Sequence, residues 1–124
     1  NAGSPYYGIR SVYDGRYRYI VNLTPEATFQ NVETKSPLFK EWKSLAETDS
    51  HAKAMTTKYQ HRPAIELYDV KNDPYCMKNL AEDAKQASTI SRLDKELKRW
   101  MKDCGDEGQP TEMRAFEHMP GKRK

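Results

Sequence analysis

Few residues in this chain are of types that do acid–base, nucleophilic or metal chemistry, and they are scattered. None of its three histidines, His51, His61 and His118, stands at a metal-ligand spacing such as H-E-x-x-H. The chain also lacks a G-x-S-x-G nucleophile motif and a glycine-rich phosphate loop. The sequence therefore predicts no catalytic residue and no metal ligand among these 124 residues.

The two cysteines, Cys76 and Cys104, lack a sequence context that would activate a thiolate, so we expect buried or idle thiols. They bracket an expected helix of about twenty residues, whose ends lie roughly 30 Å apart. A disulfide needs Cα atoms within about 7 Å, so we expect none here.

Potential ligand contacts gather in one segment, YQHRPAIELYD, residues 59–69. An arginine fork matches sulfate or carboxylate oxygens bidentately, and a histidine can donate a hydrogen bond to them. Tyr59, His61 and Arg62 are therefore the candidate substrate-binding residues. The structural alternative is that Arg62 pairs with a nearby acid, and that His61 caps the helix or is hydrated.

Two other clusters have simpler interpretations. Arg16 and Arg18 alternate with tyrosines and could stack on single-stranded nucleic acid, but a solvated strand face is commoner, and the net charge is only +3. We expect no nucleic-acid partner. Spaced acids could suggest calcium but do not follow the EF-hand order: Asp69, Asp73, Glu82 and Asp83.

The elements that must position these residues are readable from periodicity. Residues 6–23 predict a β-hairpin around Asp14-Gly15, a pair suited to a two-residue type I′ turn, with Tyr17, Tyr19 and Val21 on one face. Residues 24–35 predict a loop. Ser36-Pro37 predicts a helix start, and Leu38, Trp42 and Leu45 form its apolar stripe.

A second short helix follows Asp49 and ends at Arg62-Pro63. Ile65, Leu67 and Tyr68 predict a short strand, and Asn72-Asp73-Pro74 a turn. A long amphipathic helix runs from about Asp83 to Cys104, and Gly105 ends it. From Asp106 onward the chain is polar and is expected to be irregular.

These elements predict an α+β fold: a small antiparallel sheet, made of the hairpin and the short strand, packed against the long C-terminal helix, with two short helices. With 36% hydrophobic residues and a mean hydropathy of −1.01, the chain has room for one small core and no membrane span. So small a sheet usually needs a partner. We expect residues 1–2 to be a tag remnant, 3–105 the folded unit and 106–124 a polar tail.

The segment ELYDVKNDPYCMKNLAED resembles the C-terminal part of sulfatases, in which an E-L-Y-D-L strand leads through N-D-P to an N-L-A helix start. The hairpin RSVYDGRYRYIVNL is similar to the R-Y-K-Y-I hairpin that precedes it there. SPLFKEW followed by YQHRPAIELYD is most similar to the branch containing heparan N-sulfatase (sulfamidase, N-sulfoglucosamine sulfohydrolase) and its bacterial relatives.

The resemblance implies a non-catalytic C-terminal subdomain, docked on a catalytic domain of the same polypeptide and rimming a pocket for sulfated glycans such as heparan-type N-sulfoglucosamine. The family's formylglycine motif, C/S-x-P-x-R, does not occur in this chain. Formylglycine and calcium are implied for the parent only, as is a periplasmic or secreted location. The alternatives are an independent module for acidic polysaccharides, using Arg16, Arg18 and the lysine-rich helix face, and an oligomerisation element that forms a homodimer.

Overall fold

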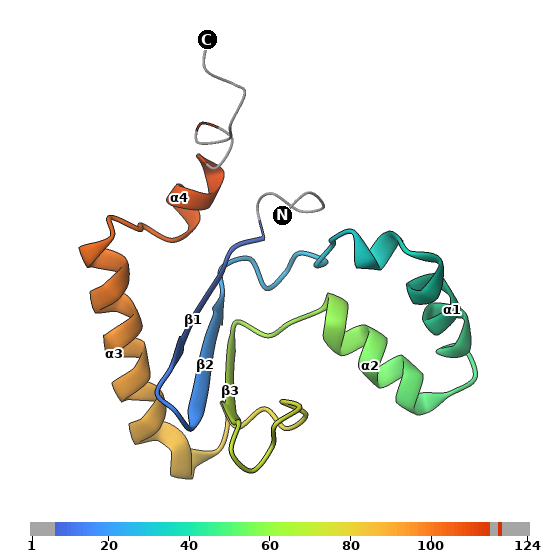
Figure 1. The fold of residues 1–124 in the computed structure, drawn as a ribbon, viewed down its shortest axis with the longest axis horizontal. Coiled ribbons are helices and arrows are strands. Elements are labelled where there is room, and N and C mark those ends of the chain that lie inside the picture. Colours follow the sequence, from blue (N-terminus) through green and yellow to red (C-terminus); the bar gives the residue numbers. More distant parts are fainter. Residues whose placement is uncertain (1–6, 115–116, 118–124) are drawn as a thin grey trace.

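The computed structural model describes residues 7–114 and 117, and its architecture confirms the α+β class (Figure 1). An antiparallel three-stranded sheet has the order β1-β2-β3, with strands β1 (Ile9–Tyr13), β2 (Tyr17–Asn22) and β3 (Ile65–Asp69). The helices are α1 (Pro37–Leu45), α2 (Ser50–Gln60), α3 (Ala87–Asp103) and α4 (Gln109–Met113), with short 3₁₀ turns at Glu33–Lys35 and Ala84–Gln86. Residues 1–2 and His118 lie outside the described residues.

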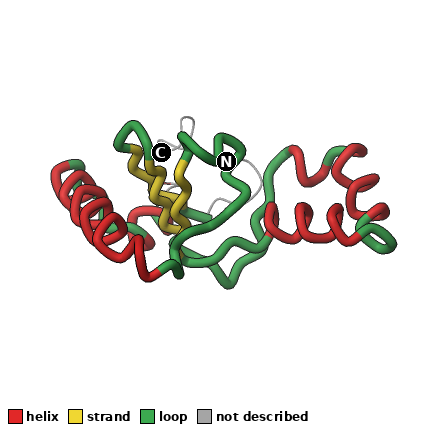
Figure 2. The backbone as a smooth tube through the Cα atoms, turned by 90° about the horizontal axis from the view of Figure 1, so that it is seen from below, coloured by secondary structure: helices red, strands yellow, loops and turns green. Residues whose placement is uncertain are grey.

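Helix α3 and the helical pair α1–α2 lie on opposite sides of the sheet (Figure 2). We call α1 and α2 together the helical arm. Helix α3 packs over the face that carries Tyr19 and Leu67, and it contributes Leu93 and Leu97 to the buried apolar cluster there. The predicted hairpin face and helix stripe therefore form the core, as the period-2 and period-3.6 patterns require.

The hairpin turn differs from the prediction. Three residues, Asp14, Gly15 and Arg16, separate β1 from β2, and of these only Gly15 has a positive φ, +97°. The predicted type I′ turn is wrong because the Asp14 carboxylate accepts the backbone N–H groups of Arg16 and Tyr17, at 2.9 and 2.7 Å. This side-chain cap stabilises a longer connection.

The apolar stripe predicted for α1 does not face the core. Phe39 is the buried residue of this helix, whereas Leu38, Trp42 and Leu45 are about half exposed, at 54%, 49% and 53%. The helix start was predicted correctly, since Ser36 Oγ accepts the N–H of Phe39 at 3.2 Å. Helix α1 thus keeps an apolar surface that the described residues cover only by about half.

The long helix begins later than predicted. Asp83 caps the preceding 3₁₀ turn by accepting the N–H of Lys85 at 3.0 Å, and α3 itself starts at Ala87. Two residues beyond the helix, Gly105 has a φ of +70°, as expected of a left-handed terminator. None of the described helices has the length and apolar composition that crossing a bilayer requires.

The segment after α3 was expected to be irregular, and this is wrong over residues 109–113, where α4 forms. Arg10 on β1 holds this segment: its guanidinium binds the Asp106 carboxylate and lies 2.7 Å from the Glu112 carboxylate. Gly8 allows the close approach, because a side chain there would collide with Glu112. The ion pairs fasten the segment to the first strand.

Candidate functional site

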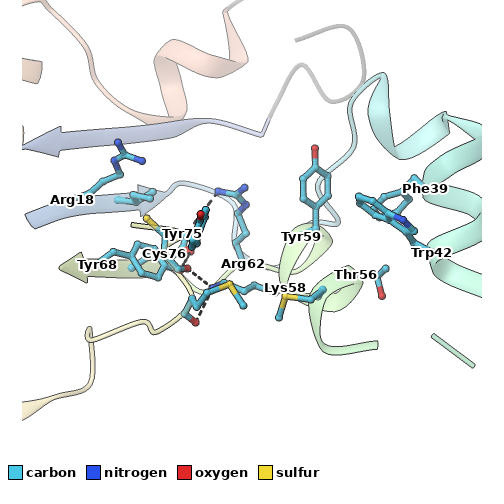
Figure 3. Close-up of a pocket in the computed structure, with 14 residues that line it drawn as sticks. Arg18, Phe39, Trp42, Thr56, Lys58, Tyr59, Arg62, Tyr68, Tyr75 and Cys76 are labelled. Atoms are coloured by element: carbon cyan, nitrogen blue, oxygen red, sulfur yellow. Dashed lines mark hydrogen bonds and ion pairs between the residues drawn. The ribbon is translucent and has the colours of Figure 1, made fainter. Parts of the chain in front are cut away.

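A cavity of about 400 Å³ opens on the face of the sheet opposite α3 (Figure 3). Strands β2 and β3, the helical arm and the loop that follows β3 all contribute to its wall. The charged residues lining it are Arg18, Lys58, Arg62 and Glu66, and the aromatic ones are Phe39, Trp42, Tyr59, Tyr68 and Tyr75. The lining therefore combines three cations and one carboxylate with five aromatic side chains.

The carboxylate of Glu66 is buried and fully engaged. Its side chain is 6% exposed and accepts hydrogen bonds from Asn22 Nδ2 at 2.8 Å and from the Tyr68 hydroxyl at 2.6 Å. Burial, followed by the hydrogen bond to Glu66, raises the pKa of Tyr68. Tyr68 therefore remains a neutral donor across the physiological pH range.

Arg62 has hydrogen-bonding capacity that the described residues do not use. Its Nη1 atom lies 3.9 Å from Glu66 Oε2, beyond hydrogen-bond distance, and its guanidinium stacks over the Phe29 ring at 5.4 Å. Its Nε atom is buried and has no hydrogen-bond partner among the described residues. An arginine held in this way retains donors for an acceptor that enters the cavity.

Lys58, in contrast, is committed to the structure. Its ammonium donates to the carbonyl oxygens of Cys76 and Met77, at 2.5 and 3.0 Å, and lies over the Tyr68 ring at 5.1 Å (Figure 3). Cys76 has a φ of +52°, the only positive φ among the described non-glycine residues. Lys58 thus ties α2 to the loop after β3 and fixes that wall of the cavity.

A row of aromatic rings positions Tyr59 at the cavity. Phe29 contacts Tyr7 and Tyr59, with ring centroids 5.2 and 5.8 Å apart, and Tyr59 in turn contacts Phe39 at 5.5 Å. The Tyr59 hydroxyl accepts a hydrogen bond from Asn31 Nδ2 at 3.0 Å. The row links the arm to the segment before β1, which makes the cavity a built feature of the fold.

Tyr59 and Arg62, two of the three predicted residues, line the cavity, but His61 does not. His61 is exposed at the C-terminal end of α2, where its backbone N–H closes the helix on Thr57. Sequence reasoning missed Arg18, Glu66 and Tyr75 as cavity residues. A signal existed for the first two, since alternation along β2 and β3 places them on the face opposite Tyr19 and Leu67.

Two of the acidic residues weighed as calcium ligands, Asp69 and Asp73, serve local structure. Asp69 accepts from Arg16 at 2.7 Å and from Asn72, and the Arg16 hydrogen bond is the main reason that its pKa falls to about 2. Asp73 accepts the N–H groups of Met77 and Lys78, which lowers its pKa. No group of three acidic, histidine or cysteine side chains comes together at metal-binding distance within the described ranges.

The cavity is suited to binding. Its lining residues include no histidine, and the Thr56 hydroxyl, which could serve as a nucleophile, donates to the Ala52 carbonyl at 2.9 Å. Cationic donors beside aromatic faces suit an anionic ligand that also presents apolar ring surface, such as a charged sugar.

Comparison with known proteins supplies the missing context. No family model matches the chain. It is 33% identical over 108 residues to an ulvan-active sulfatase of Formosa agariphila, an alignment that covers 84% of this chain and 18% of that protein. A second ulvan-active sulfatase of the same organism is 32% identical over 97 residues, which is 78% of this chain and 18% of that protein. Over these alignments the chain is similar in sequence to sulfatases.

The chain thus spans about a fifth of the length of these relatives. The general resemblance to sulfatases is supported by the comparison, whereas the narrower resemblance to heparan N-sulfatase is not.

Proposed function

We propose that this sulfatase-related chain is a non-catalytic C-terminal subdomain of a sulfatase and that its cavity contacts the sulfated glycan substrate. The observation that carries the proposal is Arg62, whose guanidinium lies among aromatic rings in the cavity wall and whose Nε has no hydrogen-bond partner among the described residues. A sulfate or uronate oxygen is the acceptor that such a group binds best. The relatives are named for ulvan, so we put ulvan first as substrate and heparan-type N-sulfoglucosamine second.

The catalytic domain of the same polypeptide is the partner in this proposal, and it would hold the formylglycine and the calcium. The surface of α1 fits such a partner. Leu38, Trp42 and Leu45 form an exposed apolar stripe, and contiguous apolar surface of this kind marks interaction sites. A periplasmic or secreted location belongs to the same proposal, because it rests on the resemblance alone.

The alternative of an independent polyanion-binding module receives less support. Several of its proposed contacts are already paired: Arg16 with Asp69 at 2.7 Å, Lys98 with Asp94 at 2.6 Å and Arg99 with Glu96 at 2.7 Å. Retention on a heparin column at physiological salt, lost steeply as salt is added, would favour the module.

The proposal is tested by binding and by turnover. We expect sulfated ulvan oligosaccharides to bind this chain, and Arg62→Ala to weaken binding about 10- to 100-fold, the range for a charge-assisted hydrogen bond. Arg16→Ala is the matched control, because Arg16 lies outside the cavity and should leave affinity unchanged. Titration calorimetry measures both variants.

Turnover is measured on the same preparations with aryl sulfate, ulvan and N-sulfated glucosamine, and we expect none. Hydrolysis above buffer would overturn the non-catalytic assignment. Equal affinity of Arg62→Ala and the unmodified chain would overturn the role of the cavity.

A further inference from the structure

The loop after β3 holds Tyr75 in a tight turn at the cavity. The Asp73 carbonyl accepts the Cys76 N–H at 3.0 Å, which closes a four-residue turn with Tyr75 as its third residue. The Asp73 carboxylate also accepts the N–H groups of Met77 and Lys78, at 3.0 and 2.8 Å. The position of Tyr75 is therefore set by hydrogen bonds within the loop itself.

A second set of contacts fixes this turn relative to the sheet and the arm. At its start, the Asp73 N–H donates to the Asp69 carbonyl at the end of β3, at 2.7 Å. At its end, the Lys58 ammonium donates to the two backbone carbonyls that follow Tyr75, at 2.5 and 3.0 Å. The turn thus keeps Tyr75 on the wall of the same cavity as Arg62 (Figure 3).

Tyr75 differs from the other four aromatic residues of the cavity. Phe39 contacts Trp42, with ring centroids 6.2 Å apart, Tyr59 belongs to the aromatic row, and Tyr68 donates to the buried carboxylate. The Tyr75 side chain makes no ring contact or hydrogen bond with a described residue and is 85% exposed. The ring therefore contributes little to the stability of this chain, so it can be substituted without disturbing the fold.

An aromatic face and a guanidinium on one cavity suit a sugar that carries an anionic group. The face of an aromatic ring is negative, and the C–H groups of a pyranose are slightly positive, so the two surfaces attract each other when they stack. A guanidinium binds the oxygens of a sulfate or carboxylate group. The combination favours a ligand in which the ring and the charge belong to one molecule.

We propose that Tyr75 is a specificity-determining residue of the cavity, whose ring stacks on the pyranose that carries the anionic group bound by Arg62. This inference rests on the proposed function, because it assigns a second contact at the same site. Recognition is then divided between two residues: Arg62 selects an anion, and Tyr75 selects a pyranose that bears it. Asp73, which is not among the lining residues, acts as a positioning residue through the turn.

Two probes separate these roles: sulfated ulvan oligosaccharides in titration calorimetry and sodium sulfate in an NMR titration. We expect Tyr75→Ala to weaken oligosaccharide binding about 3- to 10-fold, the range for one aromatic contact. The same variant should leave the sulfate-induced shift of the Arg62 Nε–H resonance unchanged. Tyr75→Phe keeps the ring face and is the matched control, which should bind the oligosaccharide as the unmodified chain does.

The contribution of the turn is tested by removing its carboxylate. Asp73→Ala should weaken oligosaccharide binding as Tyr75→Ala does, whereas Asp73→Asn retains an acceptor oxygen and should restore most of the affinity. In the complex, sugar C–H protons above the ring should shift upfield, and this shift should be absent in Tyr75→Ala. Circular dichroism and thermal melting establish that each variant is folded.

The outcomes distinguish this inference from the proposed function. If Arg62→Ala weakens oligosaccharide binding and Tyr75→Ala does not, the stacking role is overturned and the proposed function stands. A loss that Tyr75→Phe shares with Tyr75→Ala would also overturn stacking, because the ring face is present in the first variant. Unchanged affinity in both alanine variants, or no binding by the unmodified chain, would overturn the proposed function together with this inference.

Discussion

The two faces of the sheet are built by different means. The face under α3 is a dry core in which Tyr19, Leu67, Leu93 and Leu97 are each no more than 3% exposed. The opposite face holds a buried carboxylate, Glu66, with its hydrogen-bond partners and a cavity framed by cations and aromatic rings. The first face is stabilised by close packing of apolar side chains, and the second by a polar network that leaves Asn22 Oδ1 and Arg62 Nε without hydrogen-bond partners among the described residues.

This difference separates stability from recognition. A close-packed apolar core has no space and no hydrogen-bonding group for a ligand. A polar face whose hydrogen-bond donors are only partly paired can still donate to a ligand. The same strands serve both purposes because side chains alternate along β2 and β3. Loss of either face should therefore have a distinct signature.

The largest effect is expected in the dry core. Leu67→Ala removes a side chain that is 0% exposed and should cost about 2–5 kcal/mol of the free energy of unfolding, because the site cannot fully collapse. Leu45→Ala, at a position 53% exposed, is the control and should change it by about 0.5 kcal/mol or less. Urea denaturation measures the free energy of unfolding of both variants. An equal decrease in the two variants would contradict the distinction between core and arm.

A smaller effect is expected on the polar face. Glu66→Ala strands the buried donors of Asn22 and Tyr68 and should cost about 1–3 kcal/mol. Glu66→Gln retains an acceptor oxygen and should lose less. If both variants lost the same amount, simple packing rather than hydrogen bonding would explain the role of Glu66.

The smallest effect on the free energy of unfolding is expected only at alkaline pH and does not appear at neutral pH. Burial, followed by the charge of Asp94, raises the pKa of Tyr19 to about 12 from its ordinary 10. A raised folded-state pKa contributes stability in full below pH 10, and that contribution is lost as the pH rises towards 12, since only the unfolded chain then releases the proton readily.

Alkaline unfolding followed at 295 nm measures this loss, and Tyr19→Phe should flatten it. Tyr68→Phe is the companion variant on the other face, because burial and Glu66 raise the pKa of Tyr68 as well. Stability that was independent of pH between 10 and 12 in the unmodified chain would contradict the assignment.

Much of the core was predictable from the sequence, because periodicity alone places Tyr19, Leu67, Leu93 and Leu97 on apposed surfaces. The turn at Asp14 and the helix α4 were not predictable, since each depends on the hydrogen bonds that one side chain makes. The Asp14 carboxylate accepts hydrogen bonds from two backbone N–H groups, and Arg10 donates to Asp106, 96 residues further along the chain.

The cavity was predictable only in part. Tyr59 and Arg62 were found because they lie close in sequence, but Arg18, Glu66 and Tyr75 join them only when the helical arm folds back beside the sheet. The apolar stripe on α1 shows a second limit of prediction from the sequence. An amphipathic pattern predicts that an apolar face will be covered, but not that the cover is absent from the described chain.

The bridge from Lys58 to the carbonyl oxygens of Cys76 and Met77 has a dynamic consequence. The arm stands beside the sheet without entering the core cluster, and it is attached through the aromatic row, this ammonium and a hydrogen bond from the Phe29 N–H to the Gln60 carbonyl at 2.7 Å (Figure 1). The arm is then the unit that should open at the lowest free energy, ahead of global unfolding. Because the arm forms part of the cavity wall, its opening would also open the cavity. A ligand bound in the cavity would then slow amide exchange along α1 and α2.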